Sequence, residues 1–247
     1  MLSISGLSVA IGSVGILRGV SLQVASGEFA GLIGRNGAGK TTLMRTIMGL
    51  LPHREGAVEL DGASLERVPP HKRVSLGVGY MPEDRRLVPG LTVEENVLLP
   101  AWSARLPDAA RRLARVYEAI PEVHAFRARK ALQLSGGQQK LVALARALMP
   151  GTKLLLLDEP FEGVAPVLAR RLAEVIAGLR REGRSVIFSE SSLTHAQGLL
   201  DRVYVIDRGA VNASQGTSDQ VPFLIRGSSG IGDLQGGVPP CSDIPQG

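Results

Sequence analysis

Glycines, a lysine and two threonines stand between two apolar segments in the stretch GLIGRNGAGKTTL. Gly34, Gly37 and Gly39 permit backbone angles that side chains forbid, so successive N–H groups can curve around an anion. Lys40 adds a positive charge, and Thr41 places a hydroxyl where a phosphate-bound Mg²⁺ would lie. The spacing G-x-x-x-x-G-K-T is that of a P-loop, which binds phosphate. The alternative is a glycine-rich turn with an exposed lysine, but a strand before the loop and a helix after it favour the P-loop.

Two other stretches carry residues suited to phosphate chemistry. In LLLLDEP, Asp158 can hold Mg²⁺ through water, and Glu159 can orient or deprotonate an attacking water. Adjacent acids can also simply end a strand, but a P-loop elsewhere in the chain makes that interpretation weaker. In LSGGQQK, Ser135 and two glycines at the start of a predicted helix form a second anion-binding site. A loose glycine turn is the alternative for this stretch.

The elements around these motifs predict an α/β protein with a mostly parallel sheet covered on both faces. Strands are expected at EFAGLI before the P-loop and at LGVGYM. After residue 153, KLLLLD, SVIFSE and RVYVIDRG read as strands, with helices predicted at LARRLAEVIAGLRREG and LTHAQGLLD between them. Residues 1–30 and the stretch GAVELDGASL read as short antiparallel strands with tight turns.

The middle of the chain has a different pattern. Thr92 with Glu95 three residues later forms a capping box that starts a helix. Leu113, Val116, Tyr117 and Ile120 recur at helical spacing. We therefore expect a helical insertion over about residues 85–150. The end of the chain is rich in glycine, proline and serine, so residues 226–247 are predicted to be disordered.

Composition limits the class of protein. The 247 residues can form one substantial core, and only 4% of them are aromatic, so that core is mainly aliphatic. No run approaches the roughly 18 apolar residues of a membrane helix, so we expect a soluble, cytoplasmic protein. The net charge of +5 is a mild excess without a dense basic block, which suits a nucleotide or an anionic membrane but requires neither. The single cysteine, Cys241, excludes an internal disulfide.

LSGGQ about twenty residues before LLLLDEP, together with the P-loop, resembles the ABC-type ATPases, and the resemblance covers residues 1–225. It implies a P-loop NTPase (RecA-like) core with an N-terminal antiparallel β subdomain and a helical subdomain. It also implies ATP and Mg²⁺ as ligands and head-to-tail pairing of two cassettes, with each ATP between one P-loop and the other chain's LSGGQ. Glu159 would act on water, and Thr41, Asp158 and Glu83 would serve the metal. The residues implied to contact nucleotide are Ile11, Gly34, Asn36, Gly37, Ala38, Gly39, Lys40, Thr41, Thr42, Ser135, Gly136, Gly137 and Gln138.

Within that family, GYMPEDRRLVPGLTVEENV and LLLLDEPFEGVAP are similar to the cassettes of importers for branched-chain amino acids, urea and amides. The resemblance implies a sister cassette, in a heterodimer or a homodimer, two permease subunits and, indirectly, a solute-binding protein. It places the chain at the cytoplasmic face of the membrane. Residues 85–102 would receive the permease. An exporter cassette for lipid or polysaccharide, and a non-transport ABC protein acting on nucleic acid, remain the alternatives. The absence of N-K-x-D argues against GTP.

Three positions depart from the general ABC pattern. Ile11 stands where an aromatic residue usually stacks on adenine, so we expect weaker adenine binding. Glu83 replaces a glutamine, a usage that the importer branch shares. Ser191 replaces the switch histidine or glutamine that would act in catalysis, and its side chain is short and uncharged. All three belong to the half-site around the chain's own P-loop, so the two ATP sites of a heterodimer are expected to differ.

Overall fold

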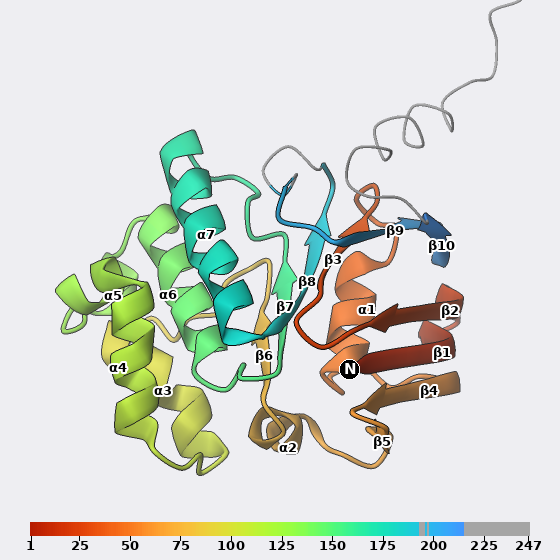
Figure 1. The fold of residues 1–247 in the computed structure, drawn as a ribbon, viewed down its shortest axis with the longest axis horizontal. Helices are drawn as coiled ribbons and strands as arrows, with labels where there is room; N and C mark the ends of the chain where they lie inside the picture. The colour runs from red at the N-terminus through yellow and green to blue at the C-terminus, as the bar shows by residue number, and fades with distance from the viewer. Residues whose placement is uncertain (193–195, 197, 215–247) are drawn as a thin grey trace, which may run out of the picture.

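The computed structural model describes residues 1–192, 196 and 198–214. Within them, two sheets and two groups of helices form layers, and the larger sheet lies at the centre (Figure 1). No helix in this described part is long and apolar enough to cross a membrane. The predicted tail at residues 226–247 lies outside the described residues, so the domain boundary at residue 225 stays a prediction. Of the predicted helix LTHAQGLLD, residues 193–195 and 197 also lie outside them, and residues 196 and 198–201 are not helical, so that part of the prediction is wrong.

The central sheet has six strands, of which five are parallel, as the alternating pattern predicted. Helices cover both of its faces, so the central strands are buried throughout, and leucine-rich and β-branched sequences fit that environment. The last strand runs antiparallel to its neighbour. In spatial order the strands are β10 (Ala210–Ser214), β9 (Arg202–Asp207), β3 (Phe29–Ile33), β8 (Ser185–Glu190), β7 (Leu154–Asp158) and β6 (Val78–Met81).

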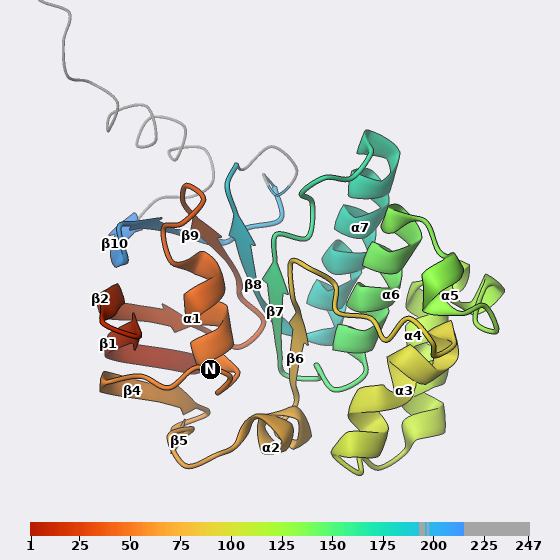
Figure 2. The ribbon, with the colours of Figure 1, turned by 180° about the vertical axis from the view of Figure 1, so that it is seen from behind.

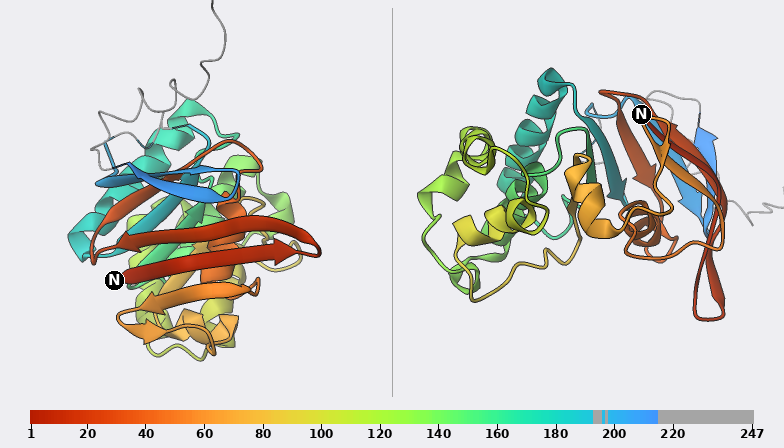
Figure 3. Two further views of the ribbon diagram at one scale, coloured as in Figure 1. Left: turned by 90° about the vertical axis from the view of Figure 1, so that its right-hand side faces the viewer. Right: turned by 90° about the horizontal axis from the view of Figure 1, so that it is seen from below.

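The N-terminal residues form a separate four-stranded antiparallel sheet, as predicted. Buried and exposed residues alternate along its strands, so one face packs inward and the other meets solvent. Figure 3 shows this sheet broadside on the left and edge-on at the right-hand side of the second view. In spatial order its strands are β2 (Val14–Val24), β1 (Leu2–Ile11), β4 (Glu55–Leu60) and β5 (Ala63–Ser64). Helix α1 (Lys40–Ile47) lies between the two sheets (Figure 2).

The remaining helices gather on the opposite side of the central sheet, apart from α2 (Figure 1). The predicted capping box of Thr92 and Glu95 is confirmed and begins α3. The predicted apolar positions of α4 are also confirmed, because Val116 and Ile120 are buried in the core of this side. The helices are α2 (Pro70–Ser75), α3 (Val93–Ser103), α4 (Ala109–Ala119), α5 (Pro121–Ala125), α6 (Gly136–Leu148) and α7 (Pro166–Leu179), with 3₁₀ turns η1 (Ala131–Gln133) and η2 (Arg180–Glu182).

Two hydrophobic clusters hold the layers together. One lies between the central sheet and the helices α3 to α7 and includes Phe29 and Phe188. The other joins α1 to both sheets and includes Leu32 and Met44. Because every parallel strand ends at the same edge of the central sheet, the loops after β3, β6, β7 and β8 meet there. The predicted P-loop, Glu83, Glu159 and Ser191 lie in or beside these loops, whereas Ile11 and residues 135–138 do not.

Candidate nucleotide site

The loop between β3 and α1 has the backbone shape that phosphate binding needs. Gly37 and Gly39 adopt φ angles of 81° and 110°, in the left-handed region that favours glycine. Gly34 is needed for a different reason, because a Cβ there would lie 2.3 Å from the carbonyl oxygen of Ile206. The loop is also anchored from outside, since the N–H of Gly209 donates to the carbonyl of Ala38 at 3.0 Å.

Lys40 turns its side chain back over this loop. Its Nζ donates to the carbonyl of Gly34 at 2.7 Å and to that of Arg35 at 3.3 Å, and it forms an ion pair with Glu159 at 3.0 Å. Lys40 is only 4% exposed. A buried lysine held beside curved backbone N–H groups provides a fixed positive charge for a phosphate.

Asp158 lies at the end of β7 and is fully buried. Three hydroxyl groups donate to its carboxylate: Ser189 at 2.5 Å, Thr41 at 3.2 Å and Tyr80 at 3.2 Å. Burial raises the pKa of Asp158, and these hydrogen bonds act against that rise. The carboxylate is therefore held in one orientation beside the Thr41 hydroxyl, and both groups are oxygen donors of the kind that Mg²⁺ prefers.

Glu159 follows in a left-handed conformation with φ of 49°. Its N–H donates to the carbonyl of Ser189 at 3.0 Å and lies 3.2 Å from that residue's Oγ. Burial alone would raise the pKa of Glu159, but hydrogen bonds with Glu162 and Lys40 outweigh it, and the pKa falls below its usual value. The same hydrogen bond with Glu159 raises the pKa of Glu162 to about 7. Of the two carboxyl groups, Glu159 therefore loses its proton first, as suits a general base.

Lys40, Thr41 and Glu159 line one cavity of about 430 Å³, whereas Asp158, Gly34 and Ala38 are not part of its lining. Glu83 reaches it from the loop after β6, and carboxylate oxygens of Glu83, Glu159 and Glu162 lie within 4.8 Å of one another. The structure thus brings Glu83 together with Lys40, Thr41 and Glu159. The cavity is lined by Ile16, Asn36, Gly37, Gly39, Lys40, Thr41, Thr42, Glu83 and Glu159.

Ile11 and Ser191 lie at less central places. Ile11 is at the tip of the β1–β2 hairpin, paired with Val14, and is 52% exposed. It is Ile16, on the same hairpin, that lines the cavity. Ser191 follows the end of β8 and is exposed. Neither position has a side chain that could stack on a base or carry charge.

The family model of the ABC transporter matches residues 17–162, more than half of the chain. This chain belongs to the ABC transporter family. The branched-chain amino acid transport ATP-binding protein BraG of Pseudomonas aeruginosa is 37% identical over 85% of this chain and 91% of that protein. LivF of Archaeoglobus fulgidus is 33% identical over 83% and 87%. The lipopolysaccharide export ATP-binding protein LptB of Escherichia coli is 33% identical over 83% and 86%.

Solved ABC cassettes have the same fold. A nucleotide-free cassette of an ABC transporter superposes with a TM-score of 0.79, with 27% identity over 92% of this chain and 95% of that one. A cassette in its ADP conformation gives 0.77, with 28% identity over 94% and 99%. The predicted fold class is therefore confirmed. The chain is an ABC ATPase subunit, and cassettes of this family bind nucleotide, pair with each other and assemble with permease subunits.

The ABC signature stretch, residues 134–138, differs from the P-loop region in its surroundings. Ser135 is the N-cap of α6 and forms a capping box with Gln138: the N–H of Gln138 donates to Ser135 Oγ at 3.3 Å, and the N–H of Ser135 donates to Gln138 Oε1 at 3.0 Å. Ser135 and Gly136 are exposed, and Gly137 and Gln138 are half-buried. The stretch lies outside the lining of the P-loop cavity.

Three positions that sequence reasoning did not single out connect these parts. Ser189 and Tyr80 hold Asp158, and Lys140 links α6 to the turn from Glu159 to Glu162. The buried Nζ of Lys140 donates to the carbonyl of Glu159 at 2.8 Å and also to that of Glu162. A lysine early in α6 and the second serine of SVIFSE, directly after the apolar residues, were the available signals, but neither identifies its partner.

Proposed function

We propose that this chain is the ATP-binding and hydrolysing subunit of an ABC importer that takes up branched-chain amino acids or a similar small polar solute. The observation that carries the ATPase part is the buried group of Lys40, Asp158 and Glu159 at one edge of the central sheet. The choice of importer rests on the similarity to BraG and LivF and on the motif usage around Glu83.

Each residue has a role that its surroundings support. The N–H groups of residues 36–42 and Lys40 bind the phosphates. Thr41 and Asp158, with Glu83 nearby, offer oxygen ligands that fit Mg²⁺, which when bound would neutralise phosphate charge. Glu159 orients and deprotonates the attacking water. Lys40→Ala should abolish ATP binding, and binding at the wild-type level in equilibrium titrations would contradict this assignment.

The partner cassette is proposed to meet this chain head to tail. Ser135, Gly137 and Gln138 are accessible at the start of a helix, where N–H groups and the helix dipole favour a phosphate. In such a pair, this chain's signature would close the partner's ATP, and the partner's signature would close ATP at Lys40. No nucleic acid is needed for this assembly.

The permease is proposed to dock in a hollow of about 330 Å³ between α1, β6 and α3. Its lining includes Leu50, Tyr80, Arg86 and Pro100, so it is partly apolar, and Leu50 is 50% exposed. The hollow lies beside the Glu83 loop, so a permease segment there would sense the nucleotide site. A chain bound to permease subunits in this way would lie at the cytoplasmic face of the membrane.

Leu50→Asp tests this docking, with Val14→Asp as its matched control on another exposed surface. Leu50→Asp should weaken co-purification with the permease and leave ATP binding unchanged, because a buried charge is costly at an apolar contact. The control should leave both co-purification and ATP binding unchanged. Equal pull-down by both variants would show that the permease binds elsewhere.

Export of lipopolysaccharide is the second candidate, because LptB proteins are 33% to 34% identical over most of this chain. Reconstitution decides between the two. The chain is combined in proteoliposomes with the permease subunits and the solute-binding protein encoded beside it, and ATP-dependent uptake of labelled leucine is measured. Uptake that disappears with Glu159→Gln supports import. Assembly only with lipopolysaccharide-extracting permeases would support export.

The two ATP sites of the assembled pair are proposed to differ if the sister cassette has the usual aromatic and switch residues. Ile11 and Ser191 weaken the half-site around this chain's P-loop, whereas its signature half-site keeps the full LSGGQ. We expect the sister's site to hydrolyse ATP about tenfold faster or more. Ser191→His should then raise the slow rate, and no change would reject a weakened site.

A further inference from the structure

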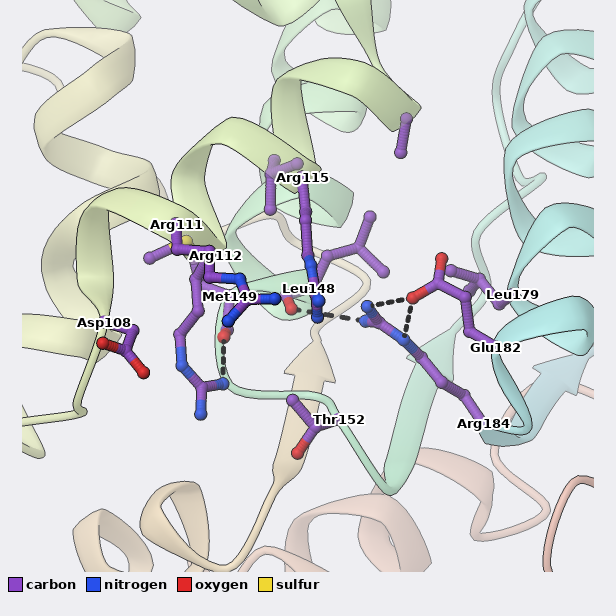
Figure 4. Close-up of a pocket in the computed structure, with 12 residues that line it drawn as sticks. Asp108, Arg111, Arg112, Arg115, Leu148, Met149, Thr152, Leu179, Glu182 and Arg184 are labelled. Carbon is purple, nitrogen blue, oxygen red and sulfur yellow. Dashed lines mark hydrogen bonds and ion pairs between the residues drawn. The ribbon is translucent and has the colours of Figure 1, made fainter.

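A second polar hollow lies at the pole of the molecule away from the nucleotide site. Its floor is the C-terminal end of α6, at Leu148 and Met149, and its walls come from α4 and from the segment between α7 and β8 (Figure 4). Thr152, just before β7, also lines it, whereas Asp158 and Glu159 follow the opposite end of that strand. The hollow and the P-loop cavity therefore lie at opposite edges of the central sheet.

Four arginines reach this hollow, and two of them are fixed. Arg184 is buried and donates to the carbonyl oxygens of Leu148 and Gly151, and its other nitrogens bind Glu182 at 2.6 and 3.0 Å. Arg112 donates to the carbonyl of Met149 at 3.1 Å. Both guanidinium groups thus satisfy carbonyl oxygens at the end of α6. Glu182 offsets the charge of Arg184, so Arg112 is the group that keeps the base of the hollow positive.

The other two arginines have no partner to offset their charge. Arg111 and Arg115 form no hydrogen bond or ion pair within the described part of the chain. Figure 4 shows both guanidinium groups turned into the hollow toward Arg184. They stand four residues apart on α4, where like charges repel each other. Glu182 is already paired with Arg184, so Asp108 is the other acidic residue of the lining.

The size of the hollow limits what could balance these charges. Its volume is about 140 Å³, room for roughly five water-sized groups and well below the volume of most sites for drug-sized ligands. A tetrahedral phosphate group fits within that space, and arginine forks match its oxygens in pairs. An adjoining hollow of about 670 Å³ shares Arg115 and Arg184 and can hold the rest of a larger molecule. It is of mixed charge, because Glu118 and Glu174 line it beside Arg171 and Arg181, and Arg171 is already paired with Glu122 and Glu174.

We propose that this arginine hollow binds the phosphate group of a small phosphorylated compound, at a site separate from the ATP site. Arg111 and Arg115 bind the phosphate oxygens, and the fixed Arg112 supplies further positive charge from below, whereas the charge of Arg184 is offset by Glu182. The remainder of the compound lies between α4 and α7. The site depends on charge placed by the fold, because its arginines come from segments about seventy residues apart in sequence.

Inorganic pyrophosphate serves as the probe in titration calorimetry on the full chain. The chain is saturated with ADP beforehand, so that the P-loop does not bind the probe. The test variant is Arg111→Gln/Arg115→Gln, and the matched control is Arg67→Gln/Lys72→Gln, which removes two exposed positive charges elsewhere. Thermal unfolding and ADP affinity check that each variant is folded. The single variant Arg111→Gln, at an exposed position, replaces the double variant if that one does not fold.

The wild type and the control are expected to bind pyrophosphate with a Kd below about 1 mM. The double variant should bind at least about tenfold more weakly, because each lost arginine removes charge-assisted hydrogen bonds. ADP affinity should stay the same in all three proteins. Absence of binding to the wild type, or equal affinity in the double variant and the control, would overturn the proposal and leave the arginines as a solvated surface.

Discussion

The P-loop region and the signature stretch both suit phosphate, but they are stabilised in different ways. Around the P-loop, buried charges and hydroxyls from β6, β7, β8 and α1 satisfy one another, as in the contacts of Asp158 with Ser189 and of Lys40 with Glu159. The signature stretch is more accessible, and its capping box is local to four residues. Groups proposed for catalysis are thus oriented by a shared buried network. Groups proposed to contact another chain's ligand are instead accessible, at a helix N-terminus that is held by its own capping box.

The largest effect is expected at Glu159, in the buried network around the P-loop. Glu159→Gln should lower steady-state ATP hydrolysis by at least about a hundredfold while ATP binding is retained, because the amide cannot deprotonate water. Phosphate release and equilibrium binding measure the two properties. Glu162→Gln, at the exposed neighbour, is the control and should cost far less. Full hydrolysis by Glu159→Gln would remove the catalytic role from the buried network.

Lys140 tests whether the two regions are physically connected. Lys140→Met removes the hydrogen bonds to the carbonyls of Glu159 and Glu162 but keeps the apolar stem. A displaced catalytic turn should lower hydrolysis by about tenfold with unchanged ATP affinity, since small misplacements of a catalytic group are costly. Lys72→Met, at an exposed position, should have no effect. If Lys140→Met loses ATP affinity instead, the lysine supports the P-loop and not the turn.

The capping boxes of α3 and α6 allow a structural effect to be separated from a functional one. Ser135→Ala and Thr92→Ala each remove an N-cap, so each should lower the free energy of unfolding by about 1 kcal/mol. Only Ser135→Ala should also lower hydrolysis by the assembled pair, by roughly fivefold for one lost hydrogen bond. Denaturant unfolding and ATPase assays separate the effects. Equal ATPase loss in both variants would show that Ser135 acts through helix stability alone.

The smallest effect concerns the charge of Glu190 beside the catalytic turn. Burial raises the pKa of Glu190 from 4.5 to about 7, although its carboxylate accepts the N–H of Phe161 at 3.0 Å. The folded state therefore holds this proton more tightly than the unfolded state. Its contribution to stability is full below about pH 4.5 and declines until about pH 7.

Glu190→Gln cannot ionise and keeps an acceptor for Phe161. It should raise the free energy of unfolding by on the order of 1 kcal/mol at about pH 8, and this gain should shrink toward about pH 5. Thermal unfolding at both pH values measures the difference. Glu59→Gln, on an exposed strand position, is the control. An equal gain at both pH values would mean that ionisation of Glu190 is not its cause.

The short motifs of this protein could be recognised from the sequence. The glycine spacing before Lys40, the acids after four leucines, and the capping boxes at Thr92 and Ser135 depend on residues within one turn or one loop of each other. Such short-range chemistry does not need the rest of the fold to be recognised. The alternation of strands and helices likewise determined the layers, because each element must bury its apolar face.

Contacts between residues far apart in the sequence became visible in the folded structure alone. The pairing of β7 with β8 sets Ser189 opposite Asp158, and a shift of one residue would turn that hydroxyl away. Packing of α6 brings Lys140 to the turn at Glu159. The bend of the β1–β2 hairpin places Ile16 in the lining of the P-loop cavity. Helix α4 places Arg115 in the same hollow as Arg184. These contacts depend on register and packing across 19 to 69 residues of chain, which no local pattern encodes.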